Sequence, residues 1–152
     1  MITINQIATF LESVKDEIPG INKTFLFIDD SHLTSHLRDV SESDNSILVG
    51  IIPSHDTQGN DVDTVQYVDY LLFMILNKRD SRNYAETITK LANAQSITKK
   101  FVQKLLSDAT DDSKPCSFLK KLDANSISID PIWDLAQCDG YSIELTTKST
   151  IL

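Results

Sequence analysis

The segment Ile47–Lys78, ILVGIIPSHDTQGNDVDTVQYVDYLLFMILNK, decides how the rest of the chain is organised. Two strongly apolar runs, Ile47–Ile52 and Val65–Leu76, enclose a polar connector, Pro53–Thr64, that is rich in turn-forming residues. The first run is short, largely β-branched and closed by a proline, which favours a strand with both faces covered. We therefore expect a long hairpin that supplies the central strands of a sheet.

The second apolar run allows an alternative. Tyr70–Leu76 is continuously apolar, and periodicity alone does not separate a buried helix from a buried strand. The neighbouring Val65, Tyr67 and Val68 add β-branched and aromatic content, and the preceding loop contains Asp, Asn and Gly. We favour the strand.

Two amphipathic helices flank this hairpin. Thr3 and Gln6 are expected to form a capping box at the start of the first helix, and Pro19-Gly20 is expected to end this helix. The second spans Asn83–Thr110, either as one helix or as two joined near Ala94–Ser96; one is simpler, because no Gly or Pro interrupts it. The apolar residues expected on their buried faces are Ile4, Ile7, Phe10, Leu11 and Val14 in the first and Tyr84, Ile88, Leu91, Val102, Leu105 and Ala109 in the second.

Three further strands are expected, at Thr24–Ile28, Ser126–Asp130 and Tyr141–Thr146, the last two from their period-two alternation. Asp139-Gly140 predicts a turn directly before the last of these, and we expect Trp133 to anchor the connection Pro131–Gly140. Ser31–Val40 is compatible with a short helix, and Cys116–Leu122 is ambiguous between helix and strand.

The fold class that follows is α+β, in one domain covering residues 1–152. Hairpin-length connections between consecutive strands imply antiparallel pairing. We expect a two-layer domain with a mainly antiparallel, twisted sheet of about five strands, and with the N-terminal and long helices packed on one face.

Charge and composition exclude several kinds of function. The chain has 22 acidic and 14 basic residues, a net charge of −8, which would repel nucleic-acid phosphates. The nearest approach to a basic cluster is interpreted as a solvated helix face, because it lacks interleaved aromatic residues and lies near acidic residues. Its members are Lys99, Lys100, Lys104, Lys120 and Lys121. The longest fully apolar run, Tyr70–Leu76, is too short to span a bilayer, so no membrane partner is expected.

The cysteines and the N-terminus suggest a compartment. Cys116 and Cys138 lack CxxC spacing, which suits free thiols in a reducing compartment, although one disulfide would also fit. The sequence MITINQIATFLESVKDE lacks the basic leader and apolar core of a signal peptide. We expect a cytoplasmic protein.

Two groups of polar residues invite a metal hypothesis. His32 and His36 lie one helical turn apart and would hold zinc if Cys116 or Cys138 completed the site, but surface histidines explain them more simply. The acidic segment His55–Asp63 suggests calcium, yet it lacks the glycine and glutamate spacing of an EF-hand and suits a solvated hairpin tip better. We predict no metal site.

The sequence also lacks the motifs that mark common catalytic sites. It contains no G-x-S-x-G, no Walker A loop and no G-x-G-x-x-G, and neither cysteine has a histidine partner marked by a motif. Paired carboxylates, Asp29-Asp30 and Asp111-Asp112, sit at the ends of predicted elements, where capping explains them. We therefore predict no catalytic residue and no cofactor, and a protein that is not an enzyme.

The order of elements resembles the tail-completion, or tail-terminator, proteins of tailed bacteriophages and prophages. The residues that carry the likeness are the hairpin Ile47–Lys78, the helix that follows from Asn83, and the closing strand GYSIELTT, Gly140–Thr147. The resemblance implies a structural protein without cofactor that self-associates into a ring and is associated with a virion. The alternative is a small binding or regulatory module that acts through protein–protein contacts of its long helix or sheet face.

Overall fold

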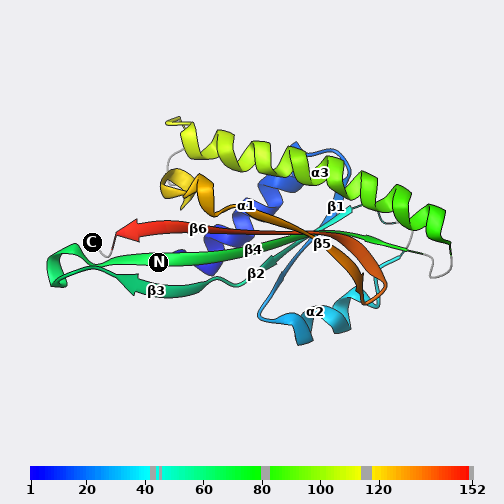
Figure 1. Ribbon diagram of the computed structural model, residues 1–152, viewed down its shortest axis with the longest axis horizontal. Helices are drawn as coiled ribbons and strands as arrows, with labels where there is room; N and C mark the ends of the chain where they lie inside the picture. The colour runs from blue at the N-terminus through cyan, green and yellow to red at the C-terminus, as the bar shows by residue number, and fades with distance from the viewer. Residues whose placement is uncertain (42–43, 45, 80–82, 114–117, 151–152) are drawn as a thin grey trace.

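The computed structural model describes the chain apart from residues 42–43, 45, 80–82, 114–117 and 151–152 (Figure 1). The α-helices are α1 (Ile4–Glu17), α2 (Asp30–Leu37) and α3 (Tyr84–Thr110). The strands are β1 (Ile21–Phe27), β2 (Ser46–Ile51), β3 (Ser54–Gln58), β4 (Gln66–Lys78), β5 (Ser128–Leu135) and β6 (Cys138–Thr150). Three short 3₁₀ helices are η1 (Val62–Thr64), η2 (Phe118–Lys121) and η3 (Ala124–Ser126). The predicted α+β class is confirmed.

The predicted central hairpin is present, and the run that was ambiguous between helix and strand is strand β4. β2 pairs antiparallel with one end of β4, from Ile47 opposite Leu76 to Gly50 opposite Phe73. β3 pairs with the other end, from Ser54 opposite Tyr70 to Gln58 opposite Gln66. The expected connector Pro53–Thr64 is therefore partly wrong. Its first half forms a strand because the long β4 offers backbone partners that local propensity does not reveal.

The sheet has six strands among the described residues, rather than about five. Its order is β1-β2-β4-β6-β5, with β3 paired to β4. β1 and β2 run parallel, which corrects the expectation that consecutive strands pair antiparallel. The reason is α2, since parallel neighbours need a crossover connection and this helix supplies it.

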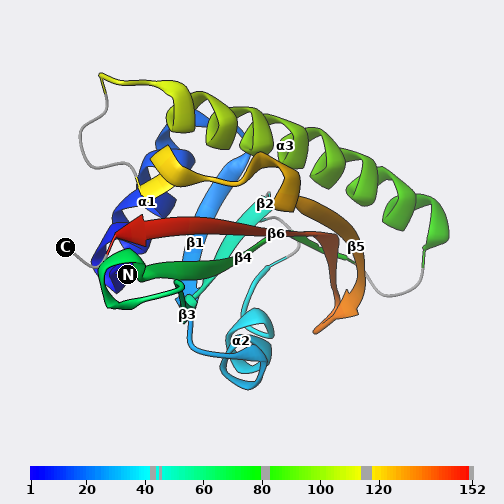
Figure 2. The ribbon, with the colours of Figure 1, turned by 60° about the vertical axis from the view of Figure 1, so that its left-hand side comes forward.

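Helices cover the two faces of the sheet unequally. α1 and α3 lie together on one face, as predicted, over a core that includes Phe10, Phe73 and Phe101 (Figure 2). α2 lies on the opposite face, where Leu33 and Leu37 complete a second, smaller core. The rest of that face has no helix over it in the described part of the chain, and we call it the bare face (Figure 2).

The two long amphipathic helices begin where the sequence predicts. The Thr3 side chain accepts the amide of Gln6, and the Gln6 side chain accepts the amide of Thr3, which completes the capping box. α3 is one uninterrupted helix capped by Asn83. Buried Asn77 links it to the sheet, because its amide donates to the carbonyl of Lys90 at 2.9 Å.

β5 and β6 each extend further into the connection between them than expected, and the predicted turn at Asp139-Gly140 is wrong. Gly140 lies inside β6, where an added Cβ would stand 1.8 Å from the carbonyl oxygen of Ile75. Glycine is therefore required by the close approach of β4. Three other residues near the turn adopt left-handed backbone angles: Asp134, Ala136 and Gln137.

Candidate functional site

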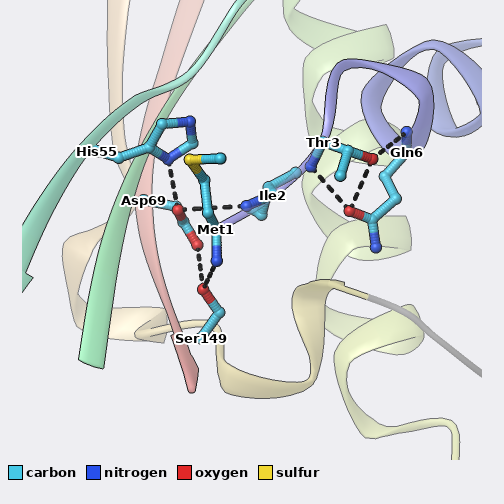
Figure 3. Close-up of polar contacts among 7 residues, drawn as sticks. All are labelled: Met1, Ile2, Thr3, Gln6, His55, Asp69 and Ser149. Atoms are coloured by element: carbon cyan, nitrogen blue, oxygen red, sulfur yellow. Dashed lines mark hydrogen bonds and ion pairs between the residues drawn. The ribbon is translucent and has the colours of Figure 1, made fainter. Parts of the chain in front are cut away.

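The strongest polar cluster surrounds Asp69, a fully buried carboxylate on β4 (Figure 3). Its Oδ1 lies 2.5 Å from Nδ1 of His55 and accepts the amide of Ile2 at 3.4 Å. Its Oδ2 accepts the hydroxyl of Ser149 at 2.8 Å, and Ser149 Oγ lies 2.6 Å from the Met1 nitrogen. One carboxylate thus joins the N-terminal segment to three strands.

Strand register brings these residues together. His55 on β3 is the direct antiparallel partner of Asp69, so their side chains leave the same face of the sheet. Ser149 on β6 pairs with Tyr67 and therefore lies beside Asp69 on the neighbouring strand. A carboxylate only accepts hydrogen bonds, so His55 carries a proton on Nδ1.

The cluster contains a serine, a histidine and an aspartate, as the active site of a serine hydrolase does, but the hydrogen bonds connect them in a different order. In a nucleophilic triad the histidine stands between the serine and the aspartate, and it takes the proton of the hydroxyl. Here His55 and Ser149 each bind a separate oxygen of Asp69, and Ser149 donates its proton to the carboxylate. The arrangement anchors the N-terminal segment and provides no activated nucleophile.

The sequence contained a signal for this cluster that pattern analysis missed. Asp69 interrupts the apolar alternation of Val65–Leu76, and a carboxylate buried in a central strand must have hydrogen-bond donors. The donors come from Ile2, His55 and Ser149, which are far from Asp69 in sequence. Only the strand register identifies them.

A second cluster lies at the opposite end of β4, around Arg79. Its guanidinium pairs with Asp134 at 2.7 Å and lies 3.4 Å from Asp139, and its Cζ stacks over the ring of Trp133 at 4.6 Å. The amide of Asp134 donates to Asp139 at 2.7 Å. These contacts hold the left-handed turn between β5 and β6. Trp133 is itself 59% exposed, so the turn is anchored by Arg79 and not by burial of the tryptophan.

The histidine pair of the zinc hypothesis lies on the outside of α2. The centroids of the His32 and His36 rings lie 4.8 Å apart, and both rings contact the ring of Phe27. Cys138 is buried in the core beneath α2, and burial raises the pKa of its thiol to about 11. Cys116 lies outside the described residues. No set of three or more His, Cys, Asp or Glu side chains that could hold a metal occurs among the described residues.

The acidic segment of the calcium hypothesis has a structural use. Ser54–Gln58 forms β3, and Asp61 caps η1 by accepting the amide of Thr64 at 3.1 Å. His55 is turned toward Asp69. The oxygens of this segment therefore serve the hairpin and its tip.

The basic residues assigned to one solvated helix face are divided. Lys99 and Lys100 are exposed, as expected. Lys104 is buried and forms ion pairs with Glu17 at 2.7 Å and Asp108 at 2.9 Å, which corrects the prediction. It ties α3 to the end of α1, because a buried ammonium needs a carboxylate partner.

The face that α3 buries differs from the one predicted. Ala94, Ile97, Phe101 and Leu105 point into the core, whereas Tyr84 and Ile88 are 75% and 48% exposed. Of the residues predicted to be buried, Leu105 is buried, and Val102 and Ala109 pack partly buried against the core. An apolar flank of α3 is left uncovered. Beside it runs a groove of about 760 Å³, lined by Val102 of the helix and by Ile129 and Tyr141 of the sheet.

The bare face of the sheet carries a second groove, of about 430 Å³. Its lining is mixed. The exposed Ile28 and Tyr70 lie there with Ile52 and Leu72, and polar groups come from Ser54, Ser126, Ser128 and Thr146. Glu144 is the only charged residue among the described residues that line this groove. The groove beside α3 is mainly apolar, as contact surfaces often are, whereas the groove on the bare face is of mixed polarity.

No protein-family model matches the chain, and no curated protein matches it significantly. In the described part of the chain, no helix is both long enough and apolar enough to cross a membrane.

Proposed function

We propose that the protein is a non-enzymatic assembly protein that associates with further copies of itself into a closed ring, as its resemblance to phage tail-completion proteins implies. The observation that carries the proposal is a projecting hairpin tip, where Val62 is exposed between Asp61 and Asp63, and a groove at a different place on the same chain. Val62, at the tip of the β3–β4 hairpin, is 91% exposed (Figure 1). The groove with Ile28 and Tyr70 lies on the bare face.

A tip and a groove on different surfaces can join copies head to tail. Such a contact makes a ring when the rotation between copies closes, and a filament when it does not. In this proposal the tip of one copy enters the bare-face groove of the next. The assembly would act in the cytoplasm, or in a virion if it belongs to a phage-like tail.

The absence of an enzymatic role is part of the proposal. It is supported by the Asp69 cluster, in which the serine and the histidine are both occupied by the carboxylate. It is also supported by the Arg79 cluster, whose charges are used to hold a turn.

The test is the absolute mass of the protein in solution, measured by light scattering after size exclusion over a range of concentrations. We expect a ring of several copies, and we expect Val62→Asp to reduce it to a smaller species. Ile4→Asp is the matched control, because Ile4 is also exposed but lies in the first turn of α1, where an acidic residue is favourable. A wild-type mass that is monomeric at every concentration contradicts the proposal.

The exposed flank of α3 favours a second candidate function, a binding module that docks a partner protein through this helix. A monomeric mass would favour it. Binding would then be lost on replacing Ile88 and retained on replacing Val62.

A further inference from the structure

One flank of α3 is exposed and almost free of charge. Helical geometry places ten residues on it within about a third of the helix circumference. They are Tyr84, Ala85, Ile88, Ala92, Gln95, Ser96, Lys99, Val102, Gln103 and Leu106. Lys99 is the only charged member, although a quarter of the whole chain is charged. Surfaces that contact water alone rarely have this composition.

A stripe of five flank residues is symmetric in sequence about Gln95, whereas the counterparts of the other five lie off the flank. Tyr84 and Leu106 lie at equal distances on either side of Gln95, and so do Ile88 and Val102. The positions near the centre include the small residues Ala92 and Ser96, which allow the backbones of two helices to approach closely. A pattern symmetric about one residue fits a copy of itself running in the opposite direction.

We propose that two copies of this chain pair through α3, antiparallel, on a two-fold axis at Gln95. Tyr84 of each copy then packs on Leu106 of the other, and Ile88 packs on Val102. Ile88 enters the groove beside Val102, between Ile129 and Tyr141. This contact is isologous, and it differs from the head-to-tail contact of the proposed ring.

Both the position of α3 and the size of its flank suit such a pair. α3 runs along one side of the molecule in both ribbon views, and its flank residues are exposed apart from the half-buried Val102 (Figures 1 and 2). The flank from Tyr84 to Leu106 is about 33 Å long at 1.5 Å per residue. With the groove residues, two copies would bury on the order of 1,000 Å², the low end for a specific interface. We therefore expect a dissociation constant in the micromolar range.

Charge also favours a copy of the same chain at this place. Each copy carries a net charge of −8, so most of its surfaces repel one another. The α3 flank has no acidic residue, and in the proposed register Lys99 lies opposite Leu91 and not opposite its own copy. Like-charge repulsion is therefore weak across this contact.

The test is cysteine cross-linking of the full chain in a Cys116→Ser background. Cys138 stays in place, because it is buried and its pKa of about 11 keeps the thiol protonated and slow to react at pH 8. Gln95→Cys is expected to give a disulfide-linked dimer, since position 95 meets its own copy within the reach of a disulfide. Ser107→Cys, exposed on another face of α3, is the matched control and is expected to form none.

The register has a sharper test. Tyr84→Cys and Leu106→Cys each place a thiol about 33 Å from its own copy, so neither single variant should cross-link. The double variant brings position 84 of one copy against position 106 of the other and should cross-link. The inference is overturned if Tyr84→Cys alone cross-links. It is also overturned if neither Gln95→Cys nor the double variant cross-links.

The two proposals fail separately. A variant that carries both Val62→Asp and Gln95→Cys tests the α3 pair without the ring. If it still cross-links while its mass falls to that of a dimer, the α3 pair is supported whether or not the ring exists. A ring in which neither Gln95→Cys nor the double variant cross-links overturns the α3 pair and leaves the ring intact. A monomer that never cross-links overturns both.

Discussion

Asp69 holds together three segments that are distant in sequence, and this explains why a charged residue is buried in the largely apolar strand β4. A buried carboxylate is tolerated only when its oxygens are hydrogen-bonded, and Ile2, His55 and Ser149 supply the donors. The sequence shows that such a carboxylate needs partners, but not which ones.

Asp69→Ala is expected to lower the free energy of unfolding by about 1–3 kcal/mol, because it leaves buried donors without an acceptor. The measurement is urea denaturation followed by circular dichroism. Asp56→Ala is the matched control, since Asp56 is an exposed neighbour on β3, and its change should stay within about 0.5 kcal/mol. Equal effects from the two variants would show that the cluster does not stabilise the N-terminal segment.

Gly140 and Trp133 show where residue-level patterns mislead. Asp-Gly commonly marks a turn, but here the glycine is needed because the backbone of β4 passes within contact distance. The actual turn uses Ala136 and Gln137 in left-handed conformations, which no propensity favours. Trp133, expected to anchor the connection between the last two strands, is exposed and lies beneath the guanidinium of Arg79.

Among the elements, those with local signals were predicted well. The capping box at Thr3 and the cap at Asn83 locate α1 and α3, and β-branched runs locate β2 and β4. β3 was missed because Ser54–Gln58 has no apolar alternation and forms only against β4. The parallel pairing of β1 with β2 was missed because it depends on α2 acting as a crossover.

The buried face of α3 was misplaced for a geometric reason. Tyr84, Ile88, Leu91 and Val102 fall on one line, and the core residues Ala94, Ile97 and Phe101 fall on a neighbouring line of the same helix. Periodicity shows that both lines are apolar but not which one meets the sheet. Three residues of the predicted line, Tyr84, Ile88 and Val102, belong to the flank now proposed as an interface.

α2 offers an element-scale prediction for its pH dependence. Hydrogen bonds to the Asp29 carboxylate, led by the amide of His32, hold the pKa of Asp29 below its usual 3.8. The capping stabilisation is therefore present above the unfolded pKa and is lost as the pH falls through the folded pKa. We expect the Ser31 and His32 amide resonances to titrate together with a midpoint below 3.8. Asp29→Asn keeps an acceptor without a titrating proton and should abolish that titration.

For the whole molecule, the net charge of −8 makes a prediction about salt. Two acidic copies repel each other at long range, whereas the α3 contact itself is nearly uncharged. Raising sodium chloride from 20 to about 300 mM should therefore tighten the α3 dimer, by roughly two- to tenfold in dissociation constant, as screening increases. Sedimentation equilibrium of the Val62→Asp variant measures this without the ring. A dimer that weakens with salt would mean that ion pairs hold it together.

The long ladder between β4 and β6 has a consequence for the time course of folding. It pairs Gln66 with Thr150 at one end and Lys78 with Cys138 at the other, so every rung joins early and late parts of the chain. β2, β3 and β4 are neighbours in sequence and can pair early, but the other edge of β4 stays unpaired until β6 is available. Contacts of such long sequence separation slow folding. During synthesis this apolar strand edge stays open until β6 has left the ribosome, and that interval is when the nascent chain is most exposed to aggregation.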